Sequence, residues 1–82
     1  MERITLYYND GRSDKVYQAS IEAKESGFVV NFAYGRRGST LNAGTKTQSP
    51  VSFEEAKKIH SELVREKLAK GYTPREDGSS YS

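Results

Sequence analysis

The residues best suited to bind a ligand lie in one short run, "AYGRRGSTLNAGTK", at positions 33–46. Its cations, Arg36, Arg37 and Lys46, can donate hydrogen bonds to the oxygens of a phosphate or a carboxylate. Tyr34 offers a flat ring on which a base or a sugar can stack. These residue types are typical of a nucleic-acid-binding loop. They would also suit an ordinary turn whose arginines are solvated.

The positive charge of the chain is concentrated in this region. Residues 1–34 carry four basic and five acidic side chains, residues 35–48 carry three basic and no acidic ones, and residues 49–82 carry six of each. The net charge of +2 therefore originates here. If the loop binds a nucleic acid, we expect Gly35 to let the phosphates approach the backbone and Lys15 to extend the cationic patch.

Other phosphate-binding patterns do not fit this run. A P-loop has four residues between its glycines and then Gly-Lys-Ser/Thr, whereas five residues separate Gly38 from Gly44, and Thr45 precedes Lys46. The residues from Gly35 to Gly38 satisfy the G-x-x-G of a KH domain. A KH domain holds this motif between two helices, whereas a strand pattern precedes it here. Only the residue types of the motif therefore match.

The rest of the chain contains no catalytic or metal-binding pattern. The chain has no cysteine, which excludes disulfides, thiolate zinc sites and a cysteine nucleophile. His60 is the only histidine, and its neighbours Ile59, Leu63 and Val64 place it on or beside a buried helical stripe. We therefore expect His60 to pack, and we expect no catalytic residue, metal, cofactor or small-molecule substrate.

Hydrophobic periodicity predicts the strands. Alternating apolar residues over Ile4–Tyr8 and Lys15–Ala23 indicate two strands, and Phe28–Tyr34 is the clearest strand pattern in the chain. The weaker extended stretch Thr45–Val51 predicts a fourth strand that ends at Pro50 or runs along a sheet edge.

After Pro50 the period changes to that of a helix. Ser52 and Glu55 form a capping box, and Gly71 is placed to end the helix, with Tyr72 folding back on its last turn. The expected apolar stripe consists of Phe53, Ala56, Ile59, Leu63, Val64 and Leu68. The prediction is an α+β fold, a small antiparallel sheet of three to four strands packed on one C-terminal helix of about five turns.

The length of 82 residues allows one hydrophobic core. We expect a single domain over residues 1–73 and a flexible tail over residues 74–82, which are rich in turn formers. No segment resembles the apolar core of a signal peptide or a membrane span. Together with the lack of cysteine, this predicts a cytoplasmic protein with no membrane partner.

Several short motifs, in their order and spacing, resemble the WGR domain family. The motifs are "SDKVYQ" at 13–18, "YGRRG" at 34–38, "GTK" at 44–46, "SFEEA" at 52–56, "EK" at 66–67 and "KGY" at 70–72. The resemblance covers roughly residues 3–73. At the position that gives the family its W, this chain has Tyr34, which keeps a flat face but offers less area than Trp.

The resemblance implies an antiparallel sheet packed on one helix, in agreement with the periodicity. In eukaryotic poly(ADP-ribose) polymerases, such a domain touches the DNA end through its Trp and adjoining protein domains through its Arg. Bacterial relatives include small free-standing copies. Because this chain has no transferase portion, the resemblance implies that it is not an enzyme.

Two hypotheses follow for the function. In the first, the chain is a non-catalytic module that binds nucleic acid weakly and with little sequence preference, at DNA ends or breaks rather than RNA. The residues assigned to this site are Tyr34, Gly35, Arg36, Arg37, Lys46 and Lys15. In the second hypothesis, the same loop docks a protein partner, whose carboxylate pairs with Arg36 or Arg37. One of these two arginines is expected to pair within the chain, and Tyr34 is either a core residue or half exposed.

Overall fold

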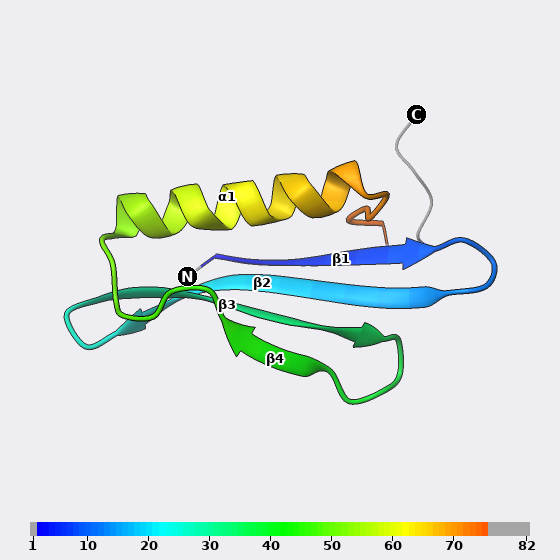
Figure 1. The fold of residues 1–82 in the computed structure, drawn as a ribbon, viewed down its shortest axis with the longest axis horizontal. Coiled ribbons are helices and arrows are strands. Elements are labelled where there is room, and N and C mark those ends of the chain that lie inside the picture. Colours follow the sequence, from blue (N-terminus) through cyan, green and yellow to red (C-terminus); the bar gives the residue numbers. More distant parts are fainter. Residues whose placement is uncertain (1, 76–82) are drawn as a thin grey trace.

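The structure is a computed structural model and describes residues 2–75. Within these residues the elements are β1 (Arg3–Asn9), β2 (Asp14–Lys24), β3 (Gly27–Arg36), β4 (Asn42–Thr45) and α1 (Phe53–Ala69). The strands form one antiparallel sheet in the order β1-β2-β3-β4, and α1 runs along the sheet (Figure 1). The α+β fold predicted from the sequence is confirmed.

The central strand β2 pairs with both β1 and β3 over most of its length. In this register Tyr17 lies between Leu6 of β1 and Tyr34 of β3. Successive residues of a strand point to opposite faces of the sheet. Tyr17, its two partners and the residues two positions away along each strand therefore share the face that α1 covers. The other face, which includes Val16 and Tyr7, points away from α1.

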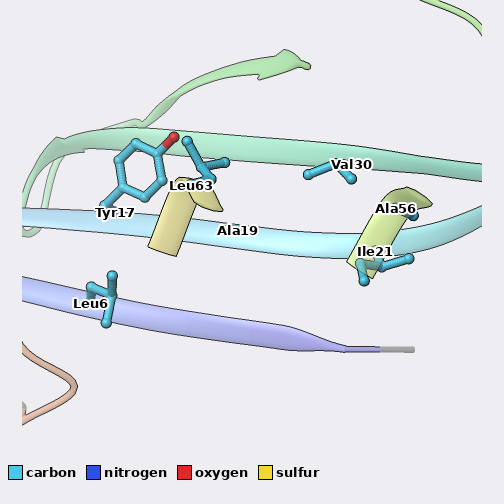
Figure 2. Close-up of a cluster of buried hydrophobic side chains, with 7 residues drawn as sticks. All are labelled: Leu6, Tyr17, Ala19, Ile21, Val30, Ala56 and Leu63. Carbon is cyan, nitrogen blue, oxygen red and sulfur yellow. The ribbon is translucent and has the colours of Figure 1, made fainter. Parts of the chain in front are cut away.

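The hydrophobic core lies between the covered face and α1 (Figure 2). Its buried members are Leu6, Tyr17, Ala19, Ile21 and Val30 from the sheet and Ala56 and Leu63 from the helix. At the edge of this core, His60 Nε2 lies 3.1 Å from the carbonyl oxygen of Ala19. A carbonyl oxygen can only accept, so Nε2 carries the proton and donates. The packing role predicted for His60 is confirmed.

Both ends of α1 are capped as the sequence predicts. The hydroxyl oxygen of Ser52 accepts a hydrogen bond of 3.1 Å from the backbone N–H of Glu55. At the other end Gly71 has a φ of +104°, and the backbone N–H of Tyr72 donates to the carbonyl oxygen of Lys67 at 3.1 Å. This pattern is a Schellman motif, which places the side chain of Tyr72 against the last turn.

The inward stripe of α1 differs from the predicted one at its ends. Phe53 is 38% exposed and Leu68 is 44% exposed, whereas Ala56 is buried. At about 100° per residue, Leu68 is turned about 120° from Ala56, but Lys67 is turned only about 20°. The stripe that faces the sheet therefore ends in a lysine and not in Leu68.

The sheet has a fourth strand at its edge, but the predicted bounds Thr45–Val51 are wrong, because β4 covers Asn42–Thr45 and only Thr45 is common to both. If the register of β3 with β4 continued, Phe28 would face Gln48, but it faces Val51. The backbone N–H of Lys46 still donates to the carbonyl oxygen of Val30 at 2.8 Å, so the ladder is interrupted between Lys46 and Val51, where Pro50 has no N–H to donate. β4 was missed because its Asn, Ala and Gly residues have low strand propensity.

The chain returns to the sheet after α1. Thr73 forms an isolated bridge with Tyr7 at the free edge of β1, with N–O distances of 2.7 and 2.8 Å. Of the tail predicted over residues 74–82, residues 76–82 lie outside the described residues, so the boundary at residue 73 stays a prediction. Within residues 2–75, no helix is long and apolar enough to span a membrane.

We expect the substitution Gly71→Ala to lower the free energy of unfolding by about 2 kcal/mol, because alanine is strained at positive φ and its Cβ crowds a neighbour. The added Cβ would lie 3.1 Å from Cε2 of Tyr8. Gly11→Ala is the control, since Gly11 has a φ of +89° but no atom within 4 Å of the added Cβ. Urea denaturation should show a loss of about 1 kcal/mol for Gly11→Ala. Equal losses in both variants would contradict the contact between Gly71 and Tyr8.

Candidate nucleic-acid interface

Three aromatic rings, Tyr17, Phe32 and Tyr34, lie together on the covered face of the sheet. Each ring centroid is 6.1 to 6.4 Å from the other two, and the ring planes differ by 6 to 18°. We call these three rings the aromatic cluster. The cause of this arrangement is the sheet register, which sets Tyr17 opposite Tyr34 and places Phe32 two residues before Tyr34 on the same face. Tyr72 contacts the cluster at the end of α1, where its ring meets that of Tyr17 edge-on at 6.2 Å.

The two tyrosines paired across the sheet differ sharply in exposure. Tyr17 is 5% exposed, whereas Tyr34 is 45% exposed. The sequence left open whether Tyr34 is a core residue, and the structure places it at the edge of the core with nearly half of its surface open to solvent. A ligand can therefore contact Tyr34 without unfolding the domain.

A first hollow of about 330 Å³ opens beside the exposed side of Tyr34. Its lining comprises Ser13, Asp14, Lys15, Tyr34, Gly35, Arg36 and Tyr72. Lys15 and Arg36 are opposite each other in the register of β2 and β3, so two cationic residues border this hollow. The Nζ of Lys15 lies 5.5 Å from the ring centroid of Tyr8. Gly35 approaches the loop after β3, where an added Cβ would lie 3.2 Å from Cδ2 of Leu41.

A second, smaller hollow of about 180 Å³ lies next to the first one. It is lined by the aromatic cluster, Tyr72, Lys46 and Lys67. The Nζ of Lys67 is 4.7 Å from the ring centroid of Tyr17, and the Nζ of Lys46 is 5.4 Å from that of Phe32. Both lysines thus hold their charge above a ring face, which is the geometry of a cation–π contact.

Arg37 lies apart from the other predicted site residues. Its guanidinium is 4.6 Å from the ring centroid of Tyr7, which lies on the face that points away from α1. Its Nε donates to Oδ1 of Asp14 at 3.0 Å, and its backbone N–H donates to the carbonyl oxygen of Asp14 at 2.8 Å. The expectation that one of the two arginines pairs within the chain is confirmed, and that arginine is Arg37.

The structure places five of the six predicted site residues along the two hollows, and it places the sixth, Arg37, away from them. Four of them, Tyr34, Gly35, Arg36 and Lys15, line the first hollow, and Lys46 lines the second. Sequence reasoning missed the contributions of Lys67 and Tyr72. Their motifs, "EK" and "KGY", carried the family resemblance, but no local pattern indicates that the end of α1 lies next to the aromatic cluster.

Acidic side chains near the two hollows are already engaged. Asp14 is paired with Arg37, and an oxygen of Glu66 lies 3.8 Å from Nζ of Lys67 and 3.9 Å from Nζ of Lys70. Arg36 forms no ion pair with any of residues 2–75 and is exposed. In the same residues, no group of three or more histidines and acids is placed to hold a metal ion.

We expect Arg37→Ala to lower the free energy of unfolding by about 1 kcal/mol. The side chains of Arg37 and Asp14 are 34% and 44% exposed, so solvent weakens their ion pair, and the contact with Tyr7 adds a similar small amount. Arg36→Ala is the matched control and should change the stability by less than about 0.5 kcal/mol. The reverse order of effects in urea denaturation would contradict the inward role of Arg37.

Burial raises the pKa of Tyr17 to about 12, and the neighbouring carboxylate of Glu66 adds to the effect. In the unfolded chain a tyrosine titrates near pH 10, so the neutral form of Tyr17 stabilises the fold. This contribution is complete below about pH 10 and is lost as the pH rises towards 12.

Wild-type protein should therefore lose about 1–2 kcal/mol more stability between pH 8 and pH 11 than Tyr17→Phe does. Urea denaturation at the two pH values measures the difference. Comparison within each protein removes any constant effect of the missing hydroxyl. Equal losses in wild type and variant would contradict the burial of the Tyr17 hydroxyl.

Comparison with known protein families identifies the family of this chain. The sequence model described as WGR domain matches residues 2–79. No curated protein and no solved structure matched the chain. WGR domains are small and non-catalytic, and nucleic-acid binding is known among them. Since the match spans nearly the whole sequence, this chain belongs to the WGR domain family.

Proposed function

We propose that this chain is a non-catalytic module that binds nucleic acid weakly and with little sequence preference, through the first hollow and Lys46. The observation that carries the proposal is the placement of Tyr34, which is 45% exposed and lines the same hollow as two cationic residues, Lys15 and Arg36, that are paired in the sheet register. An open ring beside paired cations offers a surface for stacking and donors for phosphate in one place.

Each of these residues has a distinct role in the proposal. Arg36 and Lys15 donate to phosphate oxygens, and Lys46 extends the cationic surface on the other side of Tyr34. Tyr34 stacks on a base or a sugar at an exposed end. Phosphates and ring faces are common to all nucleotides, so such contacts select little sequence. Because the family resemblance at Tyr34 is to domains that touch DNA ends, we expect DNA ends or breaks to bind rather than RNA.

Arg37 receives a positioning role instead of a phosphate contact. Its ion pair and its backbone hydrogen bond tie the residue that follows β3 to Asp14, the first residue of β2. Both contacts hold the ends of these two strands together, where Arg36 and Lys15 are paired. The loop therefore keeps its shape through one arginine while the other stays exposed.

The number of contacts sets the expected affinity. Three phosphate contacts, from Lys15, Arg36 and Lys46, correspond to a slope of log affinity against log salt of about −2.7 on duplex DNA. Such a slope means a loss of roughly 40-fold between 50 and 200 mM salt. Typical dissociation constants for non-specific binding of this kind are about 10⁻⁴ to 10⁻⁶ M.

Fluorescence anisotropy with short labelled duplexes, repeated over a series of salt concentrations, tests the proposal. We expect Arg36→Ala to weaken binding and to reduce the slope to about −1.8, because one phosphate contact is lost. Arg65→Ala is the matched control, since Arg65 is an exposed arginine of α1 that lines neither hollow. Its slope should equal that of the wild type.

Three results would overturn the proposal. Binding that is absent at millimolar protein, or that does not depend on salt, would exclude a phosphate-directed site. An equal effect of Arg36→Ala and Arg65→Ala would show that only the overall charge matters. If folded protein binds no DNA, the hypothesis that Arg36 docks a partner's carboxylate becomes the preferred one for this loop.

A further inference from the structure

The two hollows are adjoining parts of one groove, because Tyr34 and Tyr72 line both of them. The cations form two pairs, Lys15 with Arg36 in the first hollow and Lys46 with Lys67 in the second. Each hollow thus carries two cationic residues, and Tyr34 and Tyr72 are shared by both hollows. We call Lys15 and Arg36 the outer pair, and Lys46 and Lys67 the inner pair.

The second hollow has the lining of a site for a flat ring. Four of its six lining residues are aromatic and the other two are the lysines of the inner pair. Among these aromatic residues Tyr17 is 5% exposed, whereas Tyr34 is 45% exposed and also lines the first hollow. A ring that enters this space would contact aromatic side chains contributed by both the sheet and the segment after α1.

A base inside a duplex cannot enter such a space. Its faces are covered by the neighbouring base pairs, and only its edges are accessible in the grooves. To present a face to protein side chains, a base must be unpaired or turned out of the stack, which costs a few kcal/mol. A blunt end exposes one face of a complete base pair, which is larger than a single base, whereas the second hollow has a volume of only about 180 Å³.

We propose that this groove binds an unpaired nucleotide of a single strand or an overhang, with the base in the second hollow and the flanking phosphates on the outer and inner pairs of cations. The inference rests on the proposed function and narrows it to a class of substrate. It adds Lys67 and Tyr72 to the binding residues.

Each lysine of the inner pair can give up its contact with an aromatic ring for a contact with a phosphate. Each holds its ammonium group above a ring, at 4.7 Å for Lys67 and 5.4 Å for Lys46. A cation–π contact at an accessible site is weak, whereas a phosphate oxygen offers a charge-assisted hydrogen bond. When a base approaches the rings, both lysines can turn from the ring faces to the phosphate that follows it.

The test compares three labelled DNAs in fluorescence anisotropy with the full chain: a blunt duplex, the same duplex with a short unpaired extension, and the extension strand alone. We expect the extended duplex and the single strand to bind at least about 5-fold more tightly than the blunt duplex, the lower limit for stacking of one base on aromatic side chains. The extensions should be tested at the 5′ and at the 3′ end.

The matched pair of variants is Lys67→Met and Lys70→Met. Both lysines lie near Glu66, at 3.8 and 3.9 Å, but only Lys67 lines the second hollow. Methionine keeps the length of the side chain, so the helix end stays packed while the charge is removed. Lys67→Met should weaken binding of the extended and single-stranded DNAs and make their salt slope shallower by about 0.7. Lys70→Met should behave as the wild type.

The outcomes separate this inference from the proposed function. If the blunt duplex binds as tightly as the other DNAs and Arg36→Ala still weakens binding, the inference is wrong and the proposed function stands. Equal behaviour of Lys67→Met and Lys70→Met would also exclude the second hollow as the base site. If no DNA binds, the proposed function itself fails.

Discussion

One helix covers one face of the sheet, and the alternation of side chains along β2 and β3 decides which residues it meets. In a strand, neighbouring side chains point to opposite faces. The register that sends Ile21 and Val30 into the core also sends Tyr34 and Arg36 to the side of α1. Arg37 is consequently directed to the other side, where it meets Tyr7. Two adjacent arginines thus receive different environments from the same constraint that forms the core.

The boundary between core and site runs between two paired tyrosines at the end of α1. The helix ends at Ala69, and its inward stripe ends at Lys67, whose Nζ lies over the ring of Tyr17. Tyr34 is paired with Tyr17 but stands on the next strand, β3, and it is 45% exposed, whereas Tyr17 is 5% exposed. Apolar surface left open forgoes a stabilisation of about 25 cal/mol per Å². A fold that exposes an aromatic ring beside paired cations departs from what stability alone favours, as functional sites often do.

The sequence predicted those features that depend on local patterns. A period of two located three strands, the capping box at Ser52 located the start of α1, and Gly71 located its end. The fourth strand was misplaced because its position depends on tertiary fit and not on propensity. Gly44 lies beneath Phe32, where an added Cβ would be 2.6 Å from the ring, and no local pattern reports such a contact.

The site was predictable only in part, for the same reason. Tyr34, Gly35 and Arg36 are consecutive, so a motif could find them, whereas Lys67 and Tyr72 reach the groove only through the packing of α1. That packing also bears on the replacement of Trp by tyrosine at position 34. A single tyrosine offers less stacking area than Trp, but Tyr34 is one of four aromatic side chains that surround the second hollow. If a base occupies the second hollow, the stacking area in this chain is distributed over several aromatic side chains, and Tyr34 alone does not have to supply the area of a tryptophan.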